Sequence, residues 1–107
     1  MEKLYTTKNL ETIAEGDESF VKLMLDTFLS SCREAIEVMN TALAGDDYVL
    51  IGKTAHKIKP SIDTIAPDLS ESVRNVEAIV ENRNHESVAP LLSSLTATLD
   101  QLETDLA

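Results

Sequence analysis

Apolar residues recur every three or four positions along most of the chain, with charged and polar residues between them. The longest stripe begins near Glu18 and ends at Gly45, where we expect a left-handed C-terminal cap. Its apolar positions are Val21, Met24, Leu25, Phe28, Leu29, Cys32, Ile36, Met39 and Leu43. Because this spacing follows the 3.6-residue turn of an α-helix, the segment predicts one long amphipathic helix.

Three further stripes and one short pattern predict the remaining helices. The stripe after "GDD" ends at "APD", where Pro67 suits the first turn of a new helix. Its apolar positions are Ile51, Ala55, Ile58, Ile62 and Ile65. The next stripe is Leu69, Val73, Val76 and Val80, closed by "ENRNHE"; the last begins near Glu86 and carries Val88, Leu92, Leu95, Leu99, Leu102 and Leu106. A short helical pattern from Leu10 to Ala14 stops at Gly16-Asp17, which also carries a new start signal.

Four sizeable stripes joined by short connections predict an all-α fold. Short loops force neighbouring helices to run in opposite directions, so we expect an up-down-up-down antiparallel four-helix bundle with a short extra N-terminal helix. Three glycines, three prolines and four aromatic residues give little support to turns and sheets. At 107 residues the chain has the size of one ordinary domain, so we expect residues 1–107 to form a single domain.

The charge balance excludes some partners. Nineteen acidic against nine basic residues give a formal net charge of −10, which disfavours binding to a phosphate backbone. The single cysteine, Cys32, lies within an apolar stripe, so we expect it to be buried rather than reactive, as in a reducing compartment. No apolar run has the length of a membrane span or the character of a signal peptide, and we expect a cytoplasmic chain without membrane contact.

The segment "KTAHKIKPSIDTI", residues 53–65, places His56 on the polar side of the third stripe. Residues three and four positions apart share a helix face. The neighbours of His56 on this face are therefore Gly52, Lys53, Lys59 and Pro60, with Lys57 at the edge. A solvated face that carries three lysines is one interpretation. The other is a histidine nucleophile whose product is an anion, with lysines to neutralise it and compact residues to let a large partner approach.

Pro60 is unusual in the middle of a helical pattern. It has no amide hydrogen to donate to the carbonyl of His56, and its ring crowds that carbonyl. We therefore expect a local bend or a widened turn at this point, with the carbonyl of His56 turned to water.

The stretch "AHKIKPS" resembles the active-site signature of histidine phosphotransfer (HPt) domains. In that family an exposed histidine on a helix of a four-helix bundle is followed three residues later by lysine and then usually by glycine. The resemblance extends to the short first helix, to "GDESFVKLMLDTFL" at the start of the long helix, to "AGDDYVLIGKTAHK" before the histidine, and to two closing helices. Pro60 stands where the family usually has glycine.

The resemblance implies that His56 accepts a phosphoryl group and that Lys59 steadies it. HPt domains relay phosphoryl groups between aspartates of receiver domains, so the expected partners are receiver domains of a hybrid sensor kinase and of a response regulator. The chain has no Gly-rich nucleotide loop, and we expect no phosphorylation from ATP by the chain itself and hence no kinase activity. We also expect a monomer with no cofactor of its own, the magnesium being supplied by the partner receiver.

Docking of a receiver requires apolar or bare surface around the histidine. The candidates are Ile13 and Leu10 on the short helix, Phe28 or Leu29 on the long helix, and the backbone at Gly52. Lys53, Lys57 and Pro60 complete the partner-binding residues that we expect around His56.

Other kinds of function find less support. His56 and His85 fall on different predicted elements without cysteine or carboxylate at ligand spacing, so we expect no metal site. An all-helical chain of this length lacks the strained nucleophile turn of a Ser-His-Asp hydrolase. Two alternatives stay open: a noncatalytic acidic helical adaptor that binds a basic protein, and an HPt-like bundle that docks partners without transferring phosphate.

Overall fold

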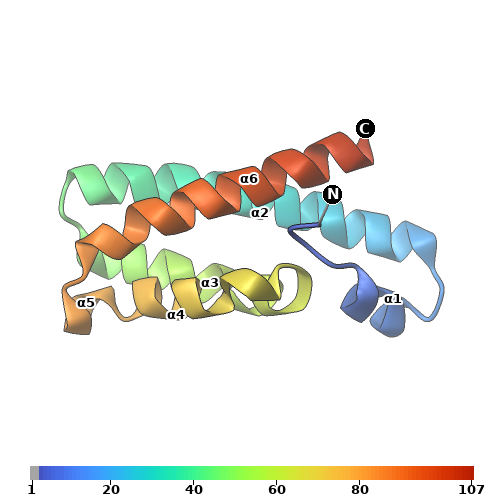
Figure 1. Ribbon diagram of the computed structural model, residues 1–107, viewed down its shortest axis with the longest axis horizontal. Helices are drawn as coiled ribbons and strands as arrows, with labels where there is room; N and C mark the ends of the chain where they lie inside the picture. Colours follow the sequence, from blue (N-terminus) through green and yellow to red (C-terminus); the bar gives the residue numbers. More distant parts are fainter. Residues whose placement is uncertain (1–2) are drawn as a thin grey trace.

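The computed structural model describes residues 3–107, so the first two residues of the predicted domain lie outside it. The described residues form six α-helices and two short 3₁₀ turns in a rod of 43 × 23 × 23 Å (Figure 1). The α-helices are α1 (Lys8–Ala14), α2 (Glu18–Ala44), α3 (Tyr48–Ile65), α4 (Ser70–Glu77), α5 (Ile79–Asn82) and α6 (Val88–Leu106). The 3₁₀ turns are Pro67–Leu69 and His85–Ser87.

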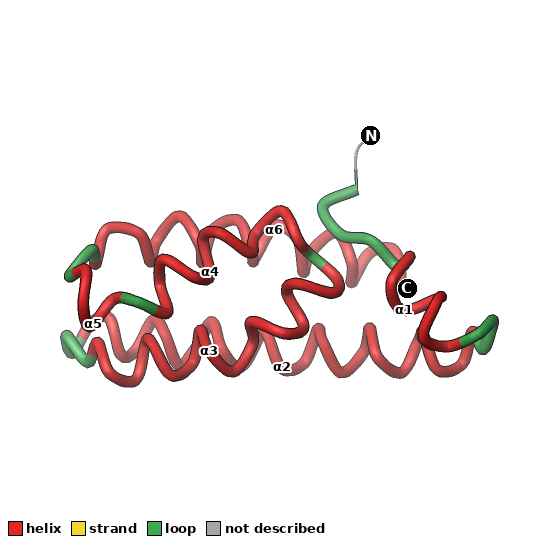
Figure 2. The backbone as a smooth tube through the Cα atoms, turned by 90° about the horizontal axis from the view of Figure 1, so that it is seen from below, coloured by secondary structure: helices red, strands yellow, loops and turns green. Residues whose placement is uncertain are grey.

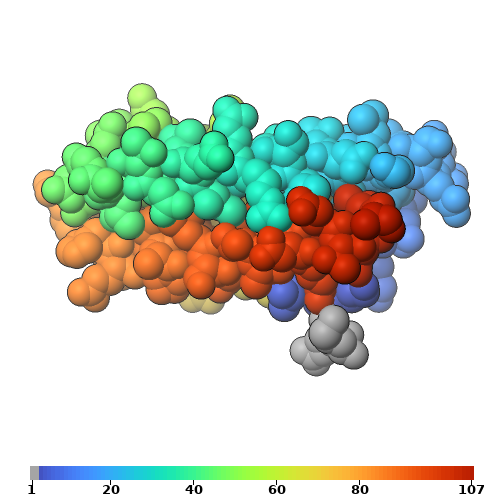
Figure 3. Space-filling view, turned by 90° about the horizontal axis from the view of Figure 1, so that it is seen from above, coloured from blue at the N-terminus to red at the C-terminus, as the bar shows by residue number. Residues whose placement is uncertain are grey.

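The four main helices form an antiparallel bundle. Helix α2 packs against α3 and α6, and α4 packs against the same two partners, α3 and α6 (Figures 1 and 2). Helices α2 and α6 share one outer face of the molecule (Figure 3), whereas α3 and α4 form the face opposite to it. The short α1 sits at one end. The predicted all-α, up-down-up-down bundle with a short N-terminal helix is confirmed.

Two aspartates fix the starts of the long helices. The side chain of Asp17 accepts a hydrogen bond from the Phe20 amide at 3.1 Å, and Asp47 accepts one from the Leu50 amide at 3.1 Å. Each carboxylate satisfies an amide that has no partner within the first turn of its helix. The start signal at Asp17 is confirmed. The left-handed cap predicted at Gly45 is wrong, because Gly45 has φ −98° and the left-handed residue is Asp46 at φ 54°.

The predicted fourth helix is divided in two. Its stripe would have continued through Val80, but the backbone leaves the helical region at Ala78 (φ −86°, ψ 13°) between α4 and α5. This break rotates the chain, so that Ile79 is fully buried while Val80 is 42% exposed. The assignment of Val80 to the buried stripe is therefore wrong, because Ile79 occupies the core position.

Helix α3 runs without interruption through Pro60 from Tyr48 to Ile65. The helix stays α-helical on both sides of the proline, so the widened turn expected there is wrong. The expected bend stays a prediction. The end of the helix at "APD" is confirmed, since Pro67 opens the following 3₁₀ turn at its first position.

The N-terminal segment ties α1 to two other helices. The amide of Thr6 donates to the carbonyl of Ile65 at 2.7 Å, at the C-terminal end of α3. The carboxylate of Asp105 on α6 accepts hydrogen bonds from Lys3 and Tyr5, each at 2.6 Å, which lower its pKa. These contacts place α1 beside the end of α3. Within residues 3–107 no helix combines the length and apolar character that crossing a membrane requires.

Cys32 lies in the bundle core and is fully buried, as predicted. Burial raises the pKa of its thiol to about 12, because the thiolate would lose its hydration. We expect the folded protein to react with a water-soluble disulfide reagent at pH 8 at least about a hundredfold more slowly than the protein unfolded in guanidinium, since only the thiolate attacks. The absorbance of the released thiolate measures the rate. Equal rates in both states would contradict the burial of Cys32.

Candidate functional site

His56 lies in the middle of α3 and points away from the core. The core side of this helix is formed by Ala55, Ile58 and Ile62, which are buried. The side chain of His56 is 74% exposed, so the prediction that it faces water is confirmed. The α-helix thus presents the imidazole on a rigid element rather than on a loop.

A carboxylate from another helix holds the ring of His56. Nδ1 of His56 forms a hydrogen bond with Oε2 of Glu77, the last residue of α4. The other carboxylate oxygen, Oε1, lies 3.4 Å from Nζ of Lys59. Glu77 therefore bridges the two residues that the sequence singled out. Glu77 could not be predicted from the sequence, because its position opposite His56 depends on how α4 packs on α3.

The charge of Glu77 determines which ring nitrogen of His56 carries the hydrogen. The hydrogen bond from His56 lowers the pKa of Glu77, outweighing partial burial, and Lys59 acts in the same direction. The stabilisation from this contact is present above the unfolded carboxyl pKa of about 4.3 and is lost as the pH falls through the lowered folded value. An ionised carboxylate can only accept, so Nδ1 of His56 carries a hydrogen. In the neutral ring the free lone pair is then on Nε2.

Gly52 has a role different from the predicted one. We expected it to offer bare backbone to a partner, but it is buried against the end of α4. A Cβ atom at this position would lie 3.0 Å from the carbonyl oxygen of Glu77. Gly52 therefore allows α4 to approach α3 closely enough for Glu77 to reach His56, and the expectation of an open backbone is wrong.

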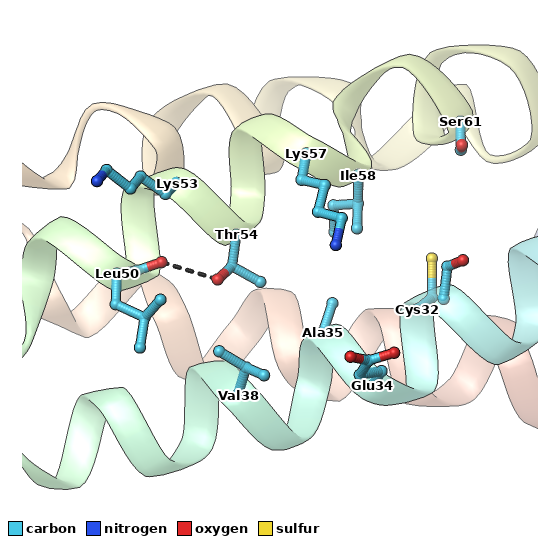
Figure 4. Close-up of a pocket in the computed structure, with 11 residues that line it drawn as sticks. Cys32, Glu34, Ala35, Val38, Leu50, Lys53, Thr54, Lys57, Ile58 and Ser61 are labelled. Atoms are coloured by element: carbon cyan, nitrogen blue, oxygen red, sulfur yellow. Dashed lines mark hydrogen bonds between the residues drawn. The ribbon is translucent and has the colours of Figure 1, made fainter.

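Lys53, Lys57 and Pro60 are exposed around His56, where the sequence analysis placed them. The ammonium groups of Lys53 and Lys57 make no hydrogen bond or ion pair with any of residues 3–107, in contrast to Lys59. Both line a groove of about 380 Å³ between α2 and α3. Figure 4 shows the Lys57 side chain reaching into this groove towards α2, above Ala35. Two unpaired cations thus stand next to the exposed histidine.

The apolar docking residues proposed on other helices have different outcomes. Phe28 is only 3% exposed and belongs to the core, so it does not offer a surface to a partner. Leu10 is buried as well, and Leu29 is half-buried against the core. Ile13 is 63% exposed, but α1 is anchored at Ile65, about 13 Å along the axis of α3 from His56. A role of Ile13 in docking stays a prediction.

No group of three or more histidine, cysteine, aspartate or glutamate side chains within residues 3–107 is arranged to hold a metal ion. Glu77 is the carboxylate in contact with His56, and it is already engaged with Lys59.

Comparisons with known proteins identify the family. A family model described as "Hpt domain" matches residues 23–105, which include His56, Lys59 and Glu77. The chain therefore belongs to the Hpt domain family, whose members are phosphotransfer modules of phosphorelays. This match confirms the resemblance seen in the sequence.

A solved structure shows the same fold. It is the HPT domain from the Hpt sensor hybrid histidine kinase from Shewanella, which is 20% identical and superposes with a TM-score of 0.78. The alignment covers 94% of this chain and 92% of that chain. At this identity the likeness establishes the fold. No curated protein matches the chain.

Proposed function

We propose that His56 accepts a phosphoryl group from an aspartyl phosphate of one receiver domain and passes it to an aspartate of another. The observation that carries this proposal is the pairing of the exposed imidazole with Glu77, which keeps the hydrogen on Nδ1 and leaves Nε2 as the nucleophile. Membership of the Hpt family supports it.

The reaction requires no added base. The lone pair of Nε2 forms the N–P bond as the bond between phosphorus and the aspartyl oxygen breaks, and the aspartate leaves as a carboxylate. Because Nδ1 keeps its hydrogen, the phosphorylated ring carries a positive charge. The carboxylate of Glu77 lies against this charge and stabilises it. The return reaction transfers the phosphoryl group to the next aspartate and restores the neutral ring.

Glu77 and Lys59 act as a pair in this scheme. Glu77 is a positioning residue, because it fixes the hydrogen and the orientation of the ring while Nε2 reacts. Lys59 lies 3.4 Å from Glu77 in the unphosphorylated protein. We infer that its ammonium turns to the phosphoryl oxygens once they arrive, since phosphoryl transfer depends mainly on positioning and on neutralising charge.

The proposal also defines what the partners supply. The receiver domains, of a hybrid sensor kinase and of a response regulator, bring the aspartate and the magnesium ion. The chain itself uses neither ATP nor a cofactor of its own. It acts as a monomer in the cytoplasm and is one domain over residues 1–107. The unpaired Lys53 and Lys57 and the exposed Pro60 belong to the surface that the receiver covers.

A phosphotransfer assay tests the proposal. A panel of receiver domains, phosphorylated with labelled phosphate, is incubated with the protein and magnesium. We expect label to appear on the protein within minutes in a form that is labile in acid and stable in alkali, as a phosphoramidate is. Phosphorus NMR is expected to assign the label to Nε2 of the ring, because Nδ1 is blocked by Glu77.

The outcomes separate the alternatives. Label on Nδ1 would contradict the role of Glu77. Label that is stable in acid would mean a hydroxyl acceptor and would exclude His56. Receivers that bind without transferring label indicate a bundle that only docks. Binding of a basic protein in the absence of any transfer favours the acidic adaptor.

A further inference from the structure

Two of the exposed apolar side chains, Val49 and Val80, lie near His56. The large hydrophobic residues that are exposed are Leu4, Ile13, Leu23, Val49, Leu50 and Val80. Val49 and Leu50 lie in the first turn of α3, and Val80 lies on α5. Val49 precedes His56 by seven residues, or two helical turns, so both side chains leave the same face of α3. Val49 is therefore an exposed apolar neighbour of the phosphoacceptor.

Val49 and Val80 both line a shallow hollow beside His56, which we call the valine cleft. Its volume is about 410 Å³. The α3 side is formed by Val49, Gly52 and Lys53, the other side by Glu77, Val80 and Glu81, and His56 completes the wall. Figure 2 is seen from the face of the bundle that α3 and α4 form. It shows the backbone of α3 on one side of this face and that of α4 and α5 on the other. A partner protein that approaches Nε2 of His56 over the valine cleft would contact both valines.

The backbone creates this cleft by breaking a helix. A continuous fourth helix would direct Val80 to the core, as its spacing predicts. The change of direction at Ala78 buries Ile79 instead and leaves Val80 42% exposed beside the cleft. The apolar wall is thus a result of local geometry and not of an excess of apolar residues.

Charges of opposite sign stand at the two sides of the valine cleft. The side chains of Lys53 on α3 and Glu81 on α5 make no hydrogen bond or ion pair with any of residues 3–107. Both side chains are therefore available to pair with charged groups of a partner that fills the cleft. The complementary surface has an apolar side chain in the middle, an acidic group next to Lys53 and a basic group next to Glu81.

We propose that the valine cleft is the contact by which this chain selects its receiver domain, through an apolar side chain of the receiver with a basic neighbour directed at Glu81. This inference rests on the proposed function and deepens it, because the receiver is the partner that has to approach Nε2 of His56. It assigns to Val49, Val80 and Glu81 a role in partner choice, whereas the sequence predicted only a docking surface, with Ile13 and Phe28 among its residues.

The test compares transfer from a receiver with direct chemical phosphorylation. Val49→Glu and Val80→Glu place a charge in the cleft without touching the core, and Ala97→Glu on α6 adds the same charge on a helix that lies across the bundle from α3. Phosphoramidate, a small phosphodonor for histidine, needs no docking surface and reports whether His56 is intact. We expect each valine variant to lower the rate of transfer from the receiver at least about tenfold, with the phosphoramidate rate unchanged.

Each result decides one question. Normal transfer in both valine variants would overturn the cleft as a receiver contact while leaving the proposed function in place. An equal loss in Ala97→Glu would overturn it too, because the effect would then come from net charge. Glu81→Lys is expected to slow transfer severalfold, and faster transfer would overturn the basic neighbour assigned to the receiver. A wild-type chain that reacts with phosphoramidate but with no receiver overturns the proposed function and this inference together.

Discussion

His56→Gln is expected to abolish phosphotransfer from every receiver that labels the wild-type protein. The glutamine amide has no nucleophilic lone pair comparable to that of Nε2, so no N–P bond forms. Its NH₂ group keeps a donor for the carboxylate of Glu77, and the position is exposed, so the free energy of unfolding should change by no more than about 0.5 kcal/mol. Acid-labile label and a thermal melt measure the two effects. Residual label at the wild-type rate would exclude His56 as the acceptor.

Lys59→Ala and Lys57→Ala provide a matched comparison for this result. Both lysines lie on α3 near His56, but only Lys59 contacts Glu77. If Lys59 neutralises the phosphoryl group, its loss slows transfer about tenfold, which corresponds to roughly 1.4 kcal/mol of transition-state stabilisation. Removing Lys57 should have a smaller effect, confined to docking. A Lys59→Ala rate equal to the Lys57→Ala and wild-type rates would contradict the role of Lys59 in neutralising the phosphoryl group.

The long helices could be predicted because their apolar stripes are unambiguous. Helix α2 follows its stripe from Glu18 to the residue before Gly45, and Asp17 supplies the expected start. The break at Ala78 could not be predicted, since Val73, Val76 and Val80 keep perfect helical spacing across it. Only the packing of Ile79 against the rest of the core decides which residue is buried. Local pattern determines where helices occur, whereas tertiary packing determines where they break.

The candidate site was predictable in the part that belongs to a single helix. His56, Lys53, Lys57 and Pro60 share α3, so their common exposure follows from the helical repeat. Glu77 is 21 residues from His56, and their contact depends on the register between α3 and α4, which the spacing does not contain. Phe28 shows the same limit. The sequence shows that it is apolar and lies on a helix, but it does not show which neighbouring helix covers it.

Gly52→Leu is expected to destabilise the fold and to separate Glu77 from His56. Even a Cβ atom at this position lies 3.0 Å from the carbonyl oxygen of Glu77, and a backbone oxygen cannot move aside as a side-chain end does. Overpacking of this kind costs about 1–3 kcal/mol, against a gain in helix propensity of at most about 1 kcal/mol. We expect a net loss of about 2 kcal/mol, or a fall in Tm of roughly 8–16 °C for a chain of this size.

Gly45→Ala is the control for this substitution, because it tests the loss of a glycine without the close contact. Gly45 has a negative φ, and a Cβ atom there meets backbone oxygens only at 3.8 and 3.9 Å, in ordinary van der Waals contact. The control should be neutral or stabilise by up to about 1 kcal/mol, since alanine has fewer unfolded conformations. Gly52→Leu should also slow labelling of His56 by phosphoramidate, as Glu77 no longer holds Nδ1. A Gly52→Leu protein as stable as Gly45→Ala would contradict the close approach of α4 to α3, and with it the reason why this glycine precedes the histidine by one turn.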